Sequence, residues 1–112
     1  MELQHRTEGN IEILELSGRF DAFEVPTVVK WFDDHATAPY ILVNLKGVGF
    51  IDSSGLSTLV RGLKRCRQNN GELSLCELQQ AVLIIFELTR LDKAFRIFRG
   101  ENEAISQMTQ SG

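Results

Sequence analysis

Apolar residues recur along the chain in short blocks, and the spacing within each block predicts a strand or a helix. An alternating or nearly continuous apolar run is typical of a β-strand. Such runs predict strands at residues 2–7, 10–17, 40–45, 73–76 and 94–98. The run at 40–45 is apolar almost throughout, which predicts a central strand buried on both faces. The turn Glu8-Gly9-Asn10 joins the first two strands into a hairpin.

Between these strands, apolar residues follow the i, i+3, i+4, i+7 spacing of a helix with one buried face. On the first helix this face consists of Val25, Val28, Val29 and Phe32. Pro26 falls in its first turn, where a missing N–H costs nothing, and Asp21 therefore lies in the preceding loop. The other predicted helices run from Ser53 to Asn69, over about residues 79–89 and from Glu101 to Gln107.

Strands that alternate with helices predict an α/β fold with parallel strands at the centre of its sheet, and the hairpin adds an antiparallel edge. The chain has 112 residues, of which 43% are hydrophobic and 24% charged, as in one ordinary globular domain. We expect a single domain over residues 1–112, with its core at about 3–107 and a short flexible tail from Gln107 to Gly112.

The charge balance and the apolar runs exclude several kinds of partner. The net charge is −3, from 12 Lys and Arg against 15 Asp and Glu, whereas a nucleic-acid binder usually has a basic surplus. One basic group is interpreted as the solvated face of the second helix: Arg61, Lys64, Arg65 and Arg67. No apolar run reaches the roughly 20 residues of a membrane-spanning helix. The chain starts without the apolar core of a secretory signal, so we expect a cytoplasmic protein that contacts neither nucleic acid nor membrane.

The residues that usually hold metals or cofactors are not spaced for that purpose. Cys66 and Cys76 each replace an apolar residue of a periodic pattern, which predicts reduced thiols in the core. His5 and His35 have no second ligand at metal-binding spacing, so we expect no metal site. Gly47-Val48-Gly49 starts like a dinucleotide-binding loop, but the place of its third glycine is taken by an aspartate. We therefore expect no cofactor.

The segment Asp52-Ser53-Ser54-Gly55 carries the most informative chemistry. It falls where a buried strand ends and a helix begins, and the free N–H groups and the helix dipole at such a junction favour negative charge. Ser53 or Asp52 can cap the helix. Capping needs one side chain, whereas Asp52, Ser53 and Ser54 are three consecutive polar residues. Gly55 has no side chain, so another protein can approach closely there.

A serine in this segment is better suited to receive a phosphate than to act as a nucleophile. A hydrolase serine normally lies in Gly-x-Ser-x-Gly and needs a base, usually histidine, and the sequence lacks this motif. A kinase brings its own catalytic groups, so its substrate needs to offer only an exposed hydroxyl. We therefore expect a chain without enzymatic activity.

Three segments that occur in order resemble STAS domains of the anti-sigma-factor antagonist family. Gly18-Arg19-Phe20-Asp21 is similar to the family's Gly-x-Leu/Phe-Asp loop. The run from Leu45 to Leu56 resembles the family signature and contains Asp-Ser-Ser-Gly-Leu. The segment from Phe86 to Asp92 resembles Leu-Glu-Leu-Thr-Gly-Leu-Asp. The similarity covers about residues 10–106.

The resemblance implies a STAS fold, which is a mixed sheet with about four helices packed mostly on one face. It also implies a bacterial partner switch, in which the unphosphorylated protein binds an anti-sigma factor of histidine-kinase-like ATPase fold and so frees the sigma factor. That partner would phosphorylate Ser54, the phosphate would block binding, and a PP2C-type phosphatase would remove it. Ser53 would be chiefly a structural cap. The implied partner-binding residues are Asp21, Asp52, Ser53, Ser54, Gly55 and Leu56.

A second interpretation is a STAS scaffold subunit of a larger assembly, such as a lipid-transport ATPase or a stressosome. Scaffolds of this kind need no phosphorylation, so a Ser54 flanked by acids favours the switch.

Four positions depart from the family pattern. Asn44 stands where the family usually has Asp. Arg90 replaces the usual Gly after the third helix, which predicts the loss of a left-handed cap. Leu83 and Ile84 occupy positions that are often polar, and helical geometry turns both toward solvent. We expect these two residues to form a contact surface for a partner or for weak self-association.

Overall fold

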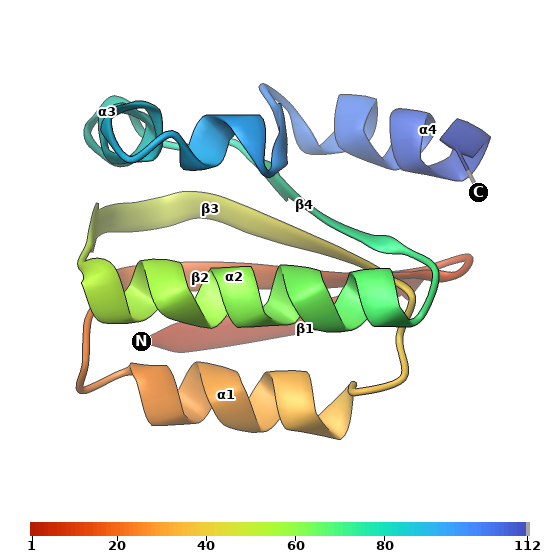
Figure 1. The fold of residues 1–112 in the computed structure, drawn as a ribbon, viewed down its shortest axis with the longest axis horizontal. Coiled ribbons are helices and arrows are strands. Elements are labelled where there is room, and N and C mark those ends of the chain that lie inside the picture. Colours follow the sequence, from red (N-terminus) through yellow and green to blue (C-terminus); the bar gives the residue numbers. More distant parts are fainter. Residues whose placement is uncertain (112) are drawn as a thin grey trace.

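The computed structural model describes the backbone of residues 1–111 and the side chains of residues 1–109. The elements of this part are, in chain order, β1 (Glu2–Glu8), β2 (Ile11–Phe20), α1 (Val25–Asp34), β3 (Tyr40–Ile51), α2 (Ser53–Gln68), β4 (Glu72–Cys76), α3 (Gln80–Leu88), the short 3-10 helix η1 (Leu91–Lys93), β5 (Arg96–Phe98) and α4 (Glu101–Ser111). The strands form one sheet, and helices lie on either side of it (Figure 1).

The strands lie in the sheet in the same order as in the chain, β1-β2-β3-β4-β5. β1 and β2 are antiparallel, with Glu8 opposite Ile11 across a tight turn in which Gly9 has a φ of 58°. β2, β3, β4 and β5 pair in parallel. Parallel neighbours need a crossover connection, and α1, α2 and α3 supply it. The predicted α/β class, with a parallel centre and an antiparallel edge, is confirmed.

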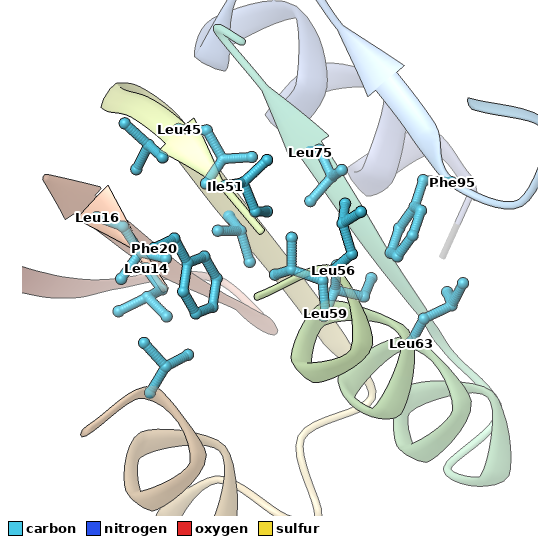
Figure 2. Packing of buried hydrophobic residues seen from close by; sticks show 14 of the residues in the cluster. Leu14, Leu16, Phe20, Leu45, Ile51, Leu56, Leu59, Leu63, Leu75 and Phe95 are labelled. Carbon is cyan, nitrogen blue, oxygen red and sulfur yellow. The ribbon is translucent and has the colours of Figure 1, made fainter. Parts of the chain in front are cut away.

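Helices α1, α2 and α3 cover one face of the sheet, and α4 covers the other. Figure 2 shows the larger core beneath α2, where Leu14 and Phe20 of β2 lie on the same side of the sheet as Leu59. The smaller core, beneath α4, consists of Ile11, Ile13, Leu42, Cys76, Ala104 and Met108. The central strands are therefore buried on both faces, as their apolar runs predicted.

Two strands are longer than their apolar patterns predict. Gly18-Arg19-Phe20, which we expected in a loop, continues β2 and pairs with the last residues of β3, with Phe20 opposite Ile51. Glycines and Lys46 interrupt the apolar run of β3 and hide this extension. Gly47 is required there, because a Cβ would lie 2.3 Å from Ser17 Oγ on the neighbouring strand. The extension matters because it brings the end of β2 beside the start of α2.

The C-terminal helix is also longer than expected. α4 reaches Ser111, whereas we expected the helix to end at Gln107. Met108 is 3% exposed and belongs to the smaller core, which stabilises the extra turn. Residue 112 and the side chains of residues 110 and 111 lie outside the described part of the structure.

Arg90 keeps the left-handed backbone that we expected to be lost with the family's glycine. Its φ is 64° and its ψ is 11°, in the turn between α3 and η1. Residues after the turn anchor it, because Phe95 is buried in the core and Lys93 N–H donates to the Arg90 carbonyl at 3.2 Å. Tertiary packing therefore outweighs the backbone preference of a non-glycine residue.

The two departures on α3 have different outcomes. Ile84 is 41% exposed, as predicted. Leu83 is half-buried, because the chain after α3 folds back and encloses it in a groove with Ile97 and Phe98. The prediction that both residues face solvent is therefore wrong for Leu83.

Cys66 and Cys76 are buried free thiols, as predicted. Burial raises the pKa of Cys66 to about 11 and the pKa of Cys76 to about 12. Both thiols are therefore protonated at neutral pH and lack the thiolate that redox or nucleophilic chemistry needs.

Candidate functional site at the start of helix α2

The Asp-Ser-Ser-Gly segment lies where β3 passes into α2, at the left edge of Figure 1. Asp52 has an extended backbone and is the N-cap of α2, since its Oδ1 accepts a hydrogen bond from Gly55 N–H at 3.0 Å. Ser53 is the first helical residue and is exposed. The prediction that Ser53 is chiefly a cap is therefore wrong: Asp52 occupies the N-cap position, and Ser53 already lies inside the helix.

Ser54 is the second residue of α2 and is half-buried. Its carbonyl accepts a hydrogen bond from Thr58 Oγ1 at 2.8 Å, so its backbone is held in the first turn of the helix. The first backbone N–H groups of a helix carry its positive partial charge. A phosphate on this turn meets a favourable local field and does not work against the helix.

The end of β2 lies directly beside this turn. Asp52 N–H donates to the Phe20 carbonyl at 3.2 Å, which closes the contact between the two segments. Asp21 follows Phe20 and lies in the loop before α1, as predicted. Its Oδ1 accepts from Phe23 N–H at 3.2 Å, and its Oδ2 lies 3.7 Å from Arg19 Nε. The structure thus brings Asp21 into the neighbourhood of Asp52.

Gly55 has an internal reason to lack a side chain. It is buried, and a Cβ there would lie 2.7 Å from the Phe20 carbonyl oxygen and 2.8 Å from Ile51 Cγ1. Packing within the chain therefore explains this glycine, and the expected contact of Gly55 with another protein stays a prediction. The glycine lets α2 start close to β2, and this contact positions Ser53 and Ser54.

Leu56 is 8% exposed and belongs to the core, but it also borders an open groove of about 300 Å³. Other residues of this groove are Ser57, Val60, Arg61, Lys64 and Leu91. The basic residues of α2 therefore fall into an exposed pair and a pair that makes salt bridges. Arg61 and Lys64 are exposed at the groove, whereas Arg65 pairs with Asp33 at 3.1 Å and Arg67 pairs with Glu72 at 3.2 Å.

Sequence reasoning missed an exposed aromatic group beside the site. Phe23 lies two residues after Asp21, and its side chain is 91% exposed. Phe50 is 38% exposed, and the Arg19 guanidinium lies 3.9 Å from the centre of its ring. The Arg19–Phe50 contact follows from the pairing of β2 with β3, so the shorter predicted strands could not reveal it. Phe23 was visible as an aromatic residue in a loop, which is an unusual place for a large apolar side chain.

The structure also brings together two histidines that are far apart in the sequence. His5 on β1 and His35 at the end of α1 have ring centres 4.7 Å apart. Glu12 of β2 completes the group, and one ligand atom from each of the three side chains lies within 4.8 Å of the others. The two histidines, which lack metal-binding spacing in the sequence, therefore lie together with a possible third ligand in three dimensions.

A model of the STAS domain matches residues 2–104, so the chain belongs to the STAS domain family. The resemblance of its three motifs to this family is confirmed. Along residues 1–111, the described helices are all too short or too polar to span a membrane.

Similar proteins include one relative in sequence and two solved structures with the same fold. An anti-sigma-B factor antagonist of Listeria monocytogenes is 30% identical over 105 residues, which cover 92% of this chain and 91% of that protein. The crystal structure of an anti-sigma factor antagonist from Mycobacterium paratuberculosis has a TM-score of 0.87 at 19% identity and covers 96% of this chain and 93% of that one. Bacillus SpoIIAA in its phosphorylated form has a TM-score of 0.76 at 18% identity, with coverage of 95% and 98%. The protein is a member of the anti-sigma factor antagonist family, whose members are regulators and not enzymes.

Proposed function

We propose that this protein is a phosphorylation-controlled partner switch. Its unphosphorylated form binds an anti-sigma factor that is also a serine kinase of histidine-kinase-like ATPase fold. Phosphorylation of Ser54 by that kinase blocks binding, and a PP2C-type phosphatase restores it. The observation that carries this proposal is the position of Ser54 in the first turn of α2, next to a cap supplied by Asp52.

The geometry supports a switch that acts at the surface and leaves the fold intact. A phosphate adds about −1.5 to −2 charges. At an exposed helix N-terminus this charge is worth roughly 0.3–1 kcal/mol in favour of the helix. Asp52 caps this turn, and Asp21 lies in the neighbouring loop with Arg19 Nε 3.7 Å from its carboxylate, so a phosphate would add to the negative charge that these two carboxylates supply. A partner that binds the uncharged serine is then repelled without unfolding of the domain.

The exposed side chains around the serine supply what a partner contacts. Phe23 and Phe50 offer apolar area, and Arg19 lies over the Phe50 ring. Aromatic and arginine side chains dominate the binding energy of many protein interfaces. A phosphate on Ser54 would change the charge of this surface and leave these exposed apolar side chains in place.

The test starts with affinity capture from the host, with wild-type protein and Ser54→Asp as baits, followed by mass spectrometry of partners and phosphosites. The captured kinase is then purified and incubated with wild type, Ser54→Ala and the matched control Ser53→Ala in the presence of ATP. Fragment-ion mapping is expected to find phosphate on Ser54 in wild type and in Ser53→Ala, and none in Ser54→Ala. Partner affinity of the phosphorylated form is expected to fall at least about tenfold, which is about 1.4 kcal/mol.

Circular dichroism and the melting temperature are expected to change little on phosphorylation. Phosphate on Ser53, or full labelling of Ser54→Ala, contradicts the assignment of the acceptor. A phosphorylated form that melts far lower contradicts the surface mechanism. A partner that binds wild type and Ser54→Asp equally would indicate a scaffold subunit instead of a switch.

A further inference from the structure

A group of side chains far from Ser54 in the sequence has the composition of a metal site. His5 lies on β1, Glu12 on β2 and His35 just after α1, so three elements contribute one residue each. Glu12 lies opposite Thr7 in the hairpin, which makes His5 its diagonal neighbour across the two strands. Diagonal neighbours are within reach of long side chains. His5 Nε2 and Glu12 Oε2 are in direct contact.

Hydrogen bonds orient two of the three side chains. His35 Nδ1 lies 2.7 Å from the Trp31 carbonyl oxygen, and because a carbonyl accepts only, Nδ1 carries the proton. In the neutral ring this leaves Nε2 with its lone pair. Thr7 Oγ1 donates to Glu12 Oε2 at 2.8 Å and steadies the carboxylate. Ligating histidines commonly donate their other N–H to a backbone carbonyl, and ligating carboxylates are in turn hydrogen-bonded.

We propose that His5, Glu12 and His35 bind a zinc ion. Two imidazole nitrogens and one carboxylate oxygen are a common zinc ligand set, with water in the fourth position. Zinc ligands at about 2.0–2.2 Å from the ion lie about 3.4 Å apart in a tetrahedral site. The ligand atoms of the three side chains lie within 4.8 Å of one another. To reach the tetrahedral spacing, no two of them would have to approach by more than about 1.4 Å. The His5 side chain is 35% exposed and the Glu12 side chain 23% exposed, so both have room to adjust.

The ion would join the end of α1 to the β1–β2 hairpin. His35 is the C-cap residue of α1, and its ring stacks on Trp31 with ring centres 4.0 Å apart. Trp31 also contacts His5, with ring centres 5.3 Å apart. Trp31 is the single tryptophan of the chain, so its fluorescence reports directly on this cluster.

The experiment is a titration of chelator-treated protein with zinc chloride, followed by Trp31 fluorescence and by calorimetry. The variants are Glu12→Gln, His5→Gln and His35→Gln. The matched control is Glu77→Gln, because Cys76, Glu77 and Glu101 form another group of ligand atoms within 4.8 Å of one another. We expect one ion per chain in wild type and in Glu77→Gln, with a saturable change in fluorescence. Each cluster variant is expected to lose at least about tenfold in affinity, since even loss of an outer-shell partner costs 10–100-fold.

Melting curves without zinc show whether each variant is folded. If His35→Gln does not fold, the zinc affinity of Glu12→Gln tests the proposal, because an amide keeps the shape of the carboxylate. Zinc is expected to raise the melting temperature of wild type and to leave that of Glu12→Gln unchanged, because a ligand that binds the native state stabilises it. Failure of wild type to saturate overturns the proposal. Equal affinity in all cluster variants, or loss of binding in Glu77→Gln, also overturns it.

Discussion

Asn44 Nδ2 donates a hydrogen bond to Glu101 Oε2 at 2.8 Å, which ties the middle of the sheet to the first turn of α4. Asn44 is 4% exposed, and its Oδ1 accepts from Lys46 N–H at 2.9 Å. Glu101 also pairs with Arg6 of β1. An aspartate, which the family usually has at this position, has no N–H to donate and would place a second negative charge against Glu101. The asparagine is therefore explained by its partner on α4.

The Glu101 carboxylate makes the fold sensitive to acid. Burial raises the pKa of Glu101, but the hydrogen bonds from Arg6 and Asn44 outweigh this and leave the pKa below its ordinary value of 4.5. A depressed pKa means that the folded state favours the ionised form. Its contribution to stability is present above pH 4.5 and is lost as the pH falls further, through the folded-state pKa.

Urea denaturation of wild type and Glu101→Gln over this pH range tests the linkage. Wild type is expected to lose more stability than Glu101→Gln as the solution becomes acidic. Glu103→Gln is the control, because Glu103 is an exposed glutamate on the same helix. Parallel pH profiles for wild type and Glu101→Gln would contradict the role assigned to Glu101.

The sequence predicted the order and type of the elements because each apolar block has a clear period. It did not predict how far β2 and β3 extend, because Gly18, Gly47 and Gly49 interrupt the alternation. Pairing between the two strands, and not local preference, keeps these residues extended. The left-handed Arg90 has the same kind of cause, since the residues after it are held by the core.

The location of the candidate site was predictable from the four adjacent residues 52–55, but the role of each of these residues was not. A motif read along the chain shows that one residue caps α2, whereas choosing Asp52 over Ser53 needs the hydrogen bond to Gly55 N–H. In the same way, the reason for Gly55 is the Phe20 carbonyl on another strand. The cluster of His5 with His35 depends on where α1 ends relative to the hairpin, and no spacing in the sequence records that.

Gly55→Ala is expected to destabilise the domain. Helix propensity alone favours alanine by up to about 1 kcal/mol. The added Cβ would lie 2.7 Å from the Phe20 carbonyl oxygen, so backbone must move, and such overpacking costs about 1–3 kcal/mol. The two contributions leave a net loss of about 0–2 kcal/mol, and we expect about 1 kcal/mol in urea denaturation. Gly100→Ala is the control, because a Cβ there meets nothing within 4 Å. Weakened partner binding at unchanged stability would instead support a direct contact at Gly55.

Phe23→Ala is expected to weaken binding of the partner captured in the Ser54 experiment at least about tenfold, or about 1.4 kcal/mol. Stability is expected to stay within about 0.5 kcal/mol, because the side chain is 91% exposed. The control is Thr37→Ala, an exposed position in the connection that enters β3 at the end opposite Asp52. Calorimetric titration measures the affinities. Unchanged affinity in Phe23→Ala would remove Phe23 from the proposed interface.

Arg90→Gly is expected to stabilise the protein. A left-handed backbone costs a non-glycine residue about 1–2 kcal/mol, and the φ of Arg90 is 64°. Glycine removes this cost but adds about 0.5–1 kcal/mol of unfolded-state entropy. The difference is a gain of up to about 1.5 kcal/mol, with a middle value of about 0.7 kcal/mol, measured by urea denaturation. Arg61→Gly is the matched control: Arg61 is an exposed residue inside α2, where glycine is expected to cost about 1 kcal/mol. Opposite signs for the two substitutions support strain at Arg90, and a loss of stability in both would show that the turn holds Arg90 without strain.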